Sequence, residues 1–352
     1  MAAISGAHQI DVLGHDELND GGTVRQAGYQ LQEDYRQKLV VVAAGEGPPA
    51  GPLSELTDTA ATILGFADLA MQIRDNLESA FIDVMIAAPD RGNGIGAALA
   101  RAAEDDLRAA GRSKLMSWTS HAGEAAADDP QAVVAPTGAG ALSRTDPAVA
   151  FALAQGFVLE QTERHSQLEL PVSSNVLDPL RSRARDRSTG YRVLAWQGLT
   201  PQQFLPGDGQ AAGADERRHP DGGDRVRAGD LGRTAGASPG SELDQARAHA
   251  LHRRRTAHES GALVAYTRLV IPVDKPGVAY QGDTLVHGDH RGHRLGLLVK
   301  LANLDAMVAD DPEVRRIHTW NAGENEWMLA INTAMGFRRA STEGACQKKC
   351  TA

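Results

Sequence analysis

The sequence predicts an α/β (α+β) protein built from two similar halves, each a mixed, mostly antiparallel sheet flanked by helices. Three observations support this fold class. Short apolar runs bounded by turn residues indicate strands at 38–44, 61–70 and 77–87. A glycine-rich stretch and an alanine-rich helical period follow, the latter from about Ile95 to Ala110. The same order of patterns then returns beyond residue 260.

The rest of the first half is predicted from periodicity and turn residues. Asp75-Asn76 is a turn pair typical of hairpins. Gly111 suits the C-terminal cap of the helix. The further elements expected are a strand at Lys114–His121, a polar loop at 122–145, a short helix at 146–155 ending in Gly156-Phe157, and an alternating strand at 158–170.

The second half repeats this order, which indicates a diverged internal duplication. Arg91 and Arg291 head the two glycine stretches. The expected elements are strands at 262–272, 279–286 and 315–320, and helices at Leu295–Val308 and 326–335, the last ending in Gly336-Phe337. The sequence YRVLAWQGLTP from Tyr191 resembles a first strand for this half. We therefore expect a first domain at 1–172, a linker at 173–188 and a second domain at 189–352.

Composition excludes several classes of protein. The 352 residues suffice for two domains with their own cores, and the formal net charge of −9 argues against nucleic-acid binding. The N-terminus lacks the basic and apolar regions of a signal peptide, and no run reaches the roughly 18 apolar residues of a membrane span. We expect a soluble, cytoplasmic protein that binds neither nucleic acid nor membrane.

The only two cysteines lie near the C-terminus. Cys346 and Cys350 are too few for a disulfide framework, and we expect free thiols on a solvated tail. The histidines are scattered without zinc-ligand spacing, so no metal is expected.

The stretch RGNGIGA offers an anion site at the start of a helix. Backbone amides there lack intrahelical partners, and the helix dipole adds about half a positive charge. Glycines leave these amides accessible to a pyrophosphate, and Arg91 adds a charged donor. An ordinary glycine turn is the alternative reading. The candidate cofactor-binding residues are Arg91, Gly92, Asn93, Gly94, Ile95, Gly96 and Ala97.

A dinucleotide-binding fingerprint is the first rival, because Gly92, Gly94 and Ala97 satisfy G-x-G-x-x-A. That motif opens the first β-α unit of a parallel sheet and needs an acid at the end of the next strand. Here a hairpin precedes it and the next strand ends in WTSH, so the context contradicts this reading.

The pattern [QR]-x-x-G-x-[GA], formed by Arg91, Gly94 and Gly96, resembles the acetyl-CoA-binding segment of the GNAT superfamily of N-acetyltransferases. The resemblance includes the preceding hairpin and the helix ending in Gly-Phe, and covers 35–170 and 260–340. It implies that the loop amides bind the CoA pyrophosphate. It also implies that the strands on either side of the helix splay to admit the pantetheine arm.

The second half resembles a tandem-GNAT group common in actinobacteria, through DTLVHGDHRGHRLGLLVKLANL and TWNAGENEWMLAINTAMGF. Here Arg294 replaces the first loop glycine. Asn325 lies eleven residues before Gly336, where many family members place an asparagine that contacts CoA; Thr145 is the first-half equivalent. The cofactor-binding candidates of this half are Arg291, Gly292, Gly296 and Asn325.

The resemblance also implies a carboxylate base on the strand before each loop. Glu78 and Asp83 are candidates in the first half and Asp283 in the second. Strand alternation puts Glu78 and Asp83 on opposite faces, so at most one faces a given site. A solvent-facing strand carboxylate is the alternative for each. The family's frequent acid, a tyrosine, is replaced by Ala152 and Asn332. Trp118, Trp320 and Trp327 are expected to be packing residues.

Residues 205–256 contain almost no β-branched or aromatic residues and are expected to be disordered. A rival hypothesis is a shifted reading frame, because GC-rich back-translation of this stretch can yield peptides similar to the tandem-GNAT group in the right order.

The function expected is acetyl transfer from acetyl-CoA to a primary amine of a small-molecule or peptide acceptor, by direct attack in a ternary complex. The alternative is a non-catalytic CoA-binding or regulatory module, and a third option is a relic without a ligand. The acids Glu124, Asp128 and Asp129 of loop 122–145 are consistent with a cationic acceptor or with simple solvation. The sequence leaves open whether the protein forms a homodimer.

Overall fold

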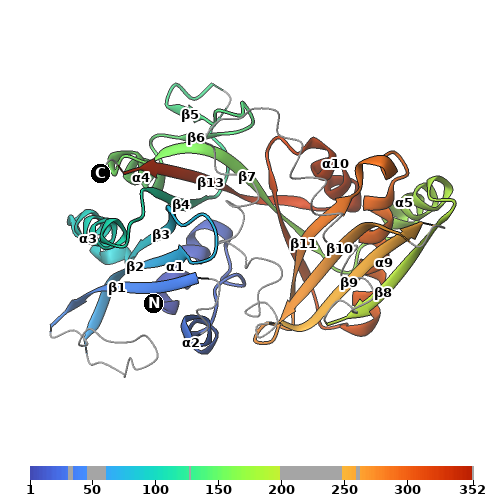
Figure 1. Cartoon of the computed structure of the whole chain (residues 1–352), viewed down its shortest axis with the longest axis horizontal. Helices are drawn as coiled ribbons and strands as arrows, with labels where there is room; N and C mark the ends of the chain where they lie inside the picture. Colours follow the sequence, from blue (N-terminus) through green and yellow to red (C-terminus); the bar gives the residue numbers. More distant parts are fainter. Residues whose placement is uncertain (31–34, 46–60, 127, 199–247, 259–261, 351–352) are drawn as a thin grey trace.

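The computed structural model describes residues 1–352 except 31–34, 46–60, 127, 199–247, 259–261 and 351–352 (Figure 1). Eleven strands form one sheet in the order β1-β2-β3-β4-β13-β7-β12-β11-β10-β9-β8. A separate two-stranded ladder joins β5 to β6. Strands and helices of both halves alternate along the chain as the sequence predicts, and the α/β class is confirmed.

The first half supplies the strands of one side. Its elements are α1 (Ala2–Leu13), α2 (Gly22–Gln30), β1 (Tyr35–Ala44), β2 (Thr62–Gln72), β3 (Ser79–Ile86), the 3-10 turn η2 (Ala88–Asp90), α3 (Ile95–Ala109), β4 (Lys114–His121), β5 (Ala132–Val134), β6 (Ala141–Ser143), α4 (Pro147–Ala154) and β7 (Val158–Glu169). The hairpin turn has Asn76 at positive φ, as its turn pair predicts.

The second half supplies the other side. Its elements are α5 (Ser174–Arg187), β8 (Tyr191–Gln197), β9 (Ala248–His258), β10 (Leu263–Pro272), β11 (Val278–Val286), the 3-10 turn η4 (Gly288–His290), α9 (Leu295–Asp310), β12 (Arg316–Ala322), α10 (Glu326–Met335) and β13 (Arg338–Lys349). The stretch 205–256 is expected to be disordered. Its residues 205–247 lie outside the described residues, and its last residues form part of β9.

The two halves exchange their final strands at the centre of the sheet. β13, the last strand of the second half, pairs antiparallel with β4 of the first half, from Thr342↔His121 to Lys349↔Lys114. β7, the last strand of the first half, pairs antiparallel with β12 of the second half. β7 and β13 pair with each other, so the sheet runs unbroken from one half to the other (Figure 1).

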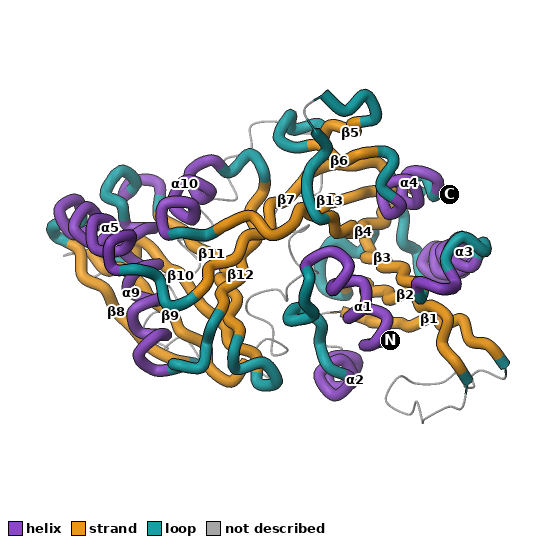
Figure 2. Tube along the Cα trace, turned by 180° about the vertical axis from the view of Figure 1, so that it is seen from behind, coloured by secondary structure: helices purple, strands orange, loops and turns teal. Residues whose placement is uncertain are grey.

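One face of this sheet carries the long helices. α3 and α4 bury Leu99, Leu107 and Val149 against the first half, whereas α9 and α10 bury Leu301 and Met335 against the second. The opposite face is here called the α1 face, because α1 contacts β3 and β13 there (Figure 2). Its residues include Phe81, Asp83, Met116, Trp118, Ser120, Glu163, His165, His318, Ser341, Glu343 and Ala345.

Residues 173–188, expected as a linker, are largely helical. The Ser173 side chain caps α5, whose Leu177, Leu180 and Ala184 are buried in the core of the second half. These three residues form only a narrow apolar stripe among many polar residues, which is why the sequence of this helix resembles a linker. The expected loop 122–145 contains the short β5–β6 hairpin.

The C-terminal segment is not a solvated tail, so that expectation was wrong. Cys346 lies in the middle of β13 and is 5% exposed, and Cys350 is 8% exposed. Both thiols are free, as expected. The tail is buried because strand exchange places β13 between two other strands, a non-local pairing without a local sequence signal.

Within the described part of the chain, no helix is long and apolar enough to cross a membrane.

The burial of both thiols predicts their reactivity. Burial raises the pKa of Cys346 to about 12, so little reactive thiolate is present in the native protein at pH 8. We expect no fast reaction of Cys346 with a disulfide reagent until denaturant is added, when both thiols should react. Rapid native-state reaction of both thiols would show that β13 does not occupy the centre of the sheet.

Candidate active site

The first glycine loop connects β3 to α3 and leaves the helix N-terminus uncapped. Gly92 and Gly94 adopt positive φ values of 80° and 79°, and Gly94 is the N-cap residue without a side-chain cap. The N-termini of α4, α5 and α10 are instead capped by Asp146, Ser173 and Asn325. The amides at the start of α3 are therefore available to an anion.

The glycines of this loop serve two different purposes. A Cβ added to Gly92 or Gly94 would meet nothing within 4 Å, so these positions face open space and need glycine for their backbone angle. A Cβ on Gly96 would come within 3.3 Å of Phe151 and 3.5 Å of Ile86, so this glycine allows α3 to pack closely. The bare amide surface and the tight packing behind it both fit a phosphate-binding turn.

Arg91 is held in place by the end of β3. Its Nε donates a hydrogen bond to the Ile86 carbonyl at 3.1 Å, while the residue stays exposed beside the loop. Arg291 makes the equivalent bond to the Val286 carbonyl at 3.4 Å. Asn93 donates a weak 3.5 Å bond to the Asp90 carbonyl and thereby stabilises the turn.

The second loop keeps the same backbone despite its substitution. Arg294 takes the N-cap position of α9 with φ of 54°, the left-handed conformation that Gly94 adopts in the first half. A non-glycine residue in this conformation costs roughly 1–2 kcal/mol. Gly292 has a φ of 85° beside open space, and Gly296 makes ordinary contacts with Val286 and Ile331. The second loop therefore keeps the shape of the first, with the guanidinium group of Arg294 added beside the start of α9.

In both halves the strands beside the loop splay apart. β3 and β4 pair in parallel at only three positions, the last being Phe81↔Met116. β11 and β12 likewise pair at three positions, ending at Tyr280↔His318. We call Phe81–Met116 the first apex and Tyr280–His318 the second apex. Beyond each apex the facing backbone groups of the two strands do not pair with each other.

Asp83 lies two residues beyond the first apex, on the α1 face. Its carboxylate accepts a backbone hydrogen bond from Trp118 across the splayed strands, and Asp68 lies opposite it on β2. Burial, followed by the charge of Asp68, raises the pKa of Asp83 to about 7. A carboxylate with this pKa is suited to accept a proton near neutral pH.

The other two carboxylate candidates lie elsewhere. Glu78 precedes β3, at the end away from the loop, and its side chain is 51% exposed beside Lys114. Asp283 is 60% exposed and lies 3.5 Å from Arg268. A bulge in β11 adds one residue between the second apex and its loop, so Gly282 rather than Asp283 corresponds to Asp83.

The caps of the short helices differ by one residue from the equivalence counted along the sequence. Asn325 caps α10 by accepting from the Met328 amide at 3.2 Å. The corresponding cap of α4 is Asp146, not Thr145. Asp146 also lies 3.0 Å from Nδ1 of the buried His121, at the end of β4. Although burial opposes it, this contact lowers the pKa of Asp146.

Two buried carboxylates on the α1 face were not predicted. Glu163 of β7 and Glu343 of β13 are register partners, 8% and 6% exposed. Burial, then the charges of Glu343 and Glu324, raises the pKa of Glu163 to about 7. Burial also raises the pKa of Glu343, which accepts a hydrogen bond from Ser120 Oγ at 2.7 Å. Only the strand exchange brings them to the face of the sheet that carries Asp83, so no local pattern in the sequence indicates them.

Comparison with solved structures identifies the fold. The chain aligns with a tandem GNAT protein from the clavulanic acid biosynthesis pathway at a TM-score of 0.62 and 24% identity, over 90% of this chain and 99% of that one. The chain has a tandem GNAT fold. No family model and no curated protein matches the sequence.

Two further structures share this fold at lower identity. A GCN5-related N-acetyltransferase from Sphaerobacter thermophilus aligns with a TM-score of 0.50 and 11% identity, over 82% of this chain and 77% of that one. A GCN5-related glucosamine N-acetyltransferase region of a fungal multi-domain GH3 β-N-acetylglucosaminidase aligns with a TM-score of 0.55 and 13% identity, over 92% of this chain and 34% of that one.

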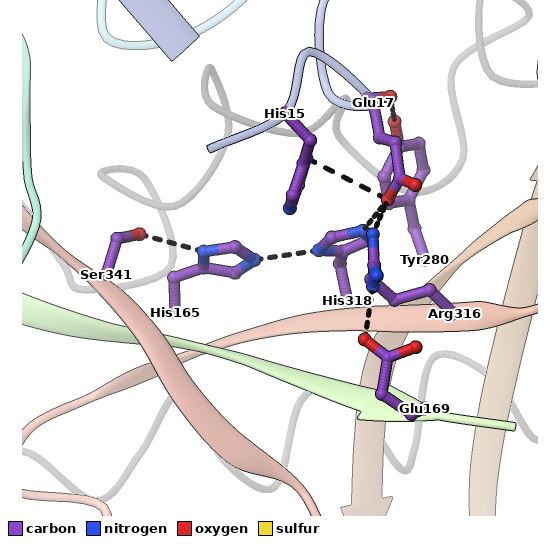
Figure 3. Close-up of polar contacts among 8 residues, drawn as sticks. All are labelled: His15, Glu17, His165, Glu169, Tyr280, Arg316, His318 and Ser341. Carbon is purple, nitrogen blue, oxygen red and sulfur yellow. Dashed lines mark hydrogen bonds and ion pairs between the residues drawn. The ribbon is translucent and has the colours of Figure 1, made fainter. Parts of the chain in front are cut away.

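In the second GNAT half, the N-terminal segment of the chain lies over the apex (Figure 3). Glu17, between α1 and α2, pairs with Arg316 at 2.5 Å and lies 3.4 Å from His318 Nε2. Its carbonyl accepts a 3.5 Å hydrogen bond from Tyr280 Oη. Asp20 lies 3.6 Å from Lys275. The chain's own carboxylates thus meet the cationic residues around this apex.

A chain of hydrogen bonds continues from Glu17 into the sheet (Figure 3). His318 Nδ1 lies 2.9 Å from His165 Nε2, and His165 Nδ1 lies 2.8 Å from Ser341 Oγ. Burial lowers the pKa of both histidines to about 3, so both are neutral at pH 7. Because the Glu17 carboxylate can only accept, His318 Nε2 donates to it, His165 donates to His318, and Ser341 donates to His165.

The tryptophans differ in their surroundings. Trp118 packs beside Phe81, Met116 and Ala345, and Trp320 stacks on His165 with 4.6 Å between ring centroids. Trp327 is 87% exposed on α10, so its expected packing role was wrong. At the tyrosine position of α10, Asn332 donates to Asn321 at 2.7 Å.

The contact of Glu17 with the second apex predicts a stability effect. Replacing Glu17 with Gln removes the charge that faces Arg316 and His318, and should cost roughly 1–2 kcal/mol of unfolding free energy. Glu169→Gln is the matched control, because Glu169 also pairs with Arg316 but its side chain is 58% exposed. The control should cost about 0.5 kcal/mol or less. If urea unfolding gave equal losses of unfolding free energy for the two variants, the contact of Glu17 with the second apex would be contradicted.

Proposed function

We propose that the protein is an N-acetyltransferase that uses acetyl-CoA and a primary amine of a small-molecule acceptor at the first apex. The observation that carries this proposal is the combination of an uncapped glycine loop, splayed strands and Asp83 beyond their last pair. Each is a feature that such a reaction needs, and all three lie along the same strand–loop–helix unit. The similar solved structures include proteins described as N-acetyltransferases, which supports the same reaction class.

The residues of the loop fit the pyrophosphate of CoA. The free amides at the start of α3 and the exposed Arg91 guanidinium offer donors and positive charge, and open space at Gly92 and Gly94 permits close approach. The unpaired backbone edges of β3 and β4 would bind the amides of the pantetheine arm. This arrangement directs the thioester toward the first apex.

Asp83 would then act as the base. The acceptor ammonium gives a proton to Asp83, and its nitrogen attacks the thioester carbonyl. The nitrogen then loses a second proton to solvent, the carbon–sulfur bond breaks as the amide forms, and the CoA thiolate takes up a proton from solvent. Attack is direct, so no acyl-enzyme forms and both substrates must be bound together. Neither Ala152 nor Asn332 can serve as the phenolic acid found in many GNAT proteins.

A non-catalytic CoA-binding module is the second candidate function. The absence of a phenol at both equivalent helix positions favours it. The two functions differ in one readout: an enzyme releases CoA thiol with a suitable amine, whereas a module binds acetyl-CoA without turnover over a broad amine panel.

The loop makes a direct prediction for cofactor affinity. Gly94→Trp places a large side chain over the free amides and should weaken acetyl-CoA binding by at least tenfold in calorimetric titration. Gly111→Trp is the matched control, because Gly111 has the same φ of 79° and open space but lies at the far end of α3. Equal affinity of Gly94→Trp and the unmodified protein would refute the loop as the cofactor site.

The raised pKa of Asp83 predicts the pH dependence of turnover. Only ionised Asp83 accepts a proton, so kcat/KM should rise with pH through about 7, the pKa of Asp83. Asp83→Asn should lower kcat roughly 100-fold or more and abolish this rise. Asp283→Asn, at the corresponding distance from the second loop, should leave the profile unchanged. A profile that persists in Asp83→Asn assigns the base to another group.

A further inference from the structure

The end of β4 carries a connected set of three polar side chains beyond the first apex. Thr119 Oγ1 lies 2.8 Å from Nε2 of His121, and Nδ1 of His121 lies 3.0 Å from Oδ2 of Asp146, the N-cap residue of α4. His121 is 4% exposed, whereas Thr119 is half-buried. These side chains connect β4, where it has separated from β3, to the start of the helix that contacts it.

The carboxylate of Asp146 determines where the protons of this set lie. A carboxylate only accepts, so His121 carries a proton on Nδ1, and Nε2 is the atom that exchanges a proton with the Thr119 hydroxyl. Asp146 also accepts hydrogen bonds from two amides of α4, which fix its carboxylate. Its negative charge stabilises the imidazolium form of His121, in which Nε2–H donates to Thr119 Oγ1. The Thr119 hydroxyl then donates to the Gly344 carbonyl at 3.3 Å.

Thr119 lies opposite the position of the missing phenol. Counted from the two apexes, it corresponds to Asn321 of β12. Asn321 accepts a 2.7 Å hydrogen bond from Asn332, the α10 residue at the tyrosine position. The first half has Ala152 at that position of α4, and its methyl group cannot donate a proton. By this correspondence, Thr119 faces the helix position that a phenolic acid would take.

The second half lacks the equivalent set of side chains. His121 corresponds to Gly323, which has no side chain, and Asn321 is bonded to Asn332 instead. Gly282 likewise corresponds to Asp83. Of the two apexes, the first therefore combines a carboxyl base on one strand with a histidine and a hydroxyl on the other.

We propose that Thr119, His121 and Asp146 form a proton relay that replaces the phenolic acid. The inference rests on the acetyltransferase function proposed above and assigns the route by which the CoA thiolate receives its proton. As the carbon–sulfur bond breaks, the Thr119 hydroxyl turns from Gly344 to the sulfur, gives it a proton and takes the Nε2 proton of His121. His121 becomes neutral and regains a proton from solvent, so protons and charges balance. Thr119 touches the sulfur, whereas His121 and Asp146 act through it.

Two other titratable groups lie near His121. His8 of α1 and Glu343 of β13 are both within range of its charge. Asp146 is the ionic partner in direct contact with the ring. Replacing Asp146 therefore tests the charge that holds the imidazolium, without changing the other two groups.

Steady-state kinetics of the full chain tests the relay, with acetyl-CoA and the fastest acceptor among tyramine, spermidine, glucosamine and kanamycin. His121→Gln keeps a hydrogen bond to Thr119 but supplies no acid, so it should lower kcat roughly 100-fold. The calorimetric dissociation constant of acetyl-CoA should change by less than about threefold. The kcat of the unmodified protein should fall at alkaline pH, where His121 is neutral, and His121→Gln should lack this fall.

Further variants separate the relay from a structural role. Thr119→Val should lower kcat as His121→Gln does, whereas Thr119→Ser keeps the hydroxyl and should retain most of the activity. Asp146→Asn keeps a good N-cap for α4 and should move the alkaline fall of kcat to lower pH, because the imidazolium loses its anionic partner.

An unchanged kcat in Thr119→Val would overturn the relay. So would an alkaline fall of kcat that is the same in the unmodified protein, His121→Gln and Asp146→Asn. Acetyl-CoA binding by the unmodified protein without release of CoA thiol to any of the four amines would instead refute the acetyltransferase function itself.

Discussion

The antiparallel ladder between β7 and β13 is the interaction on which the rest of the structure depends. Each of these strands ends one half of the duplicated chain, yet each pairs outward with a strand of the other half. The result is a single sheet with the two glycine loops at separate places along it (Figure 1). A sheet joined at its centre couples both halves, so residues of one half complete the surroundings of the other.

Charge is distributed unequally between the two apexes. The second apex is surrounded by Arg316, Lys275 and neutral histidines, and the N-terminal segment supplies Glu17 and Asp20 to it. Around the first apex lie Asp68, which accepts a hydrogen bond from Tyr29 Oη at 2.7 Å, and Asp83, whose pKa is raised by burial and by the charge of Asp68. The duplicated halves have therefore diverged: carboxylates of the N-terminal segment pair with cationic residues at the second apex, whereas the first apex keeps a carboxyl group with a raised pKa.

Local patterns in the sequence predicted the local elements of the fold. The periodicity of 95–110 and the Gly111 cap gave α3, and the alternation near 114–121 gave β4, because these depend on neighbours along the chain. The exchange of β7 and β13 could not be predicted this way, since strand partners distant in sequence leave no periodic signal. For the same reason the burial of Cys346 and the presence of Glu343 near Asp83 were missed.

The candidate site was predicted in part. The glycine loop follows from residue type and spacing, and the structure shows the uncapped helix that this spacing implies. The choice between Glu78 and Asp83 required the position of the first apex. Asp283 does not correspond to Asp83, because a bulge adds one residue to β11 between the second apex and its loop. The contact of Glu17 with the second apex depends on the packing of an irregular connection, which no local pattern encodes.

A crystal structure of the chain with bound acetyl-CoA would test the central claim most directly. The account predicts the pyrophosphate on the amides of Gly94–Ala97 and the thioester between β3 and β4, beside Asp83. Acetyl-CoA bound only at the Arg291–Gly296 loop, or with its thioester remote from Asp83, would contradict it.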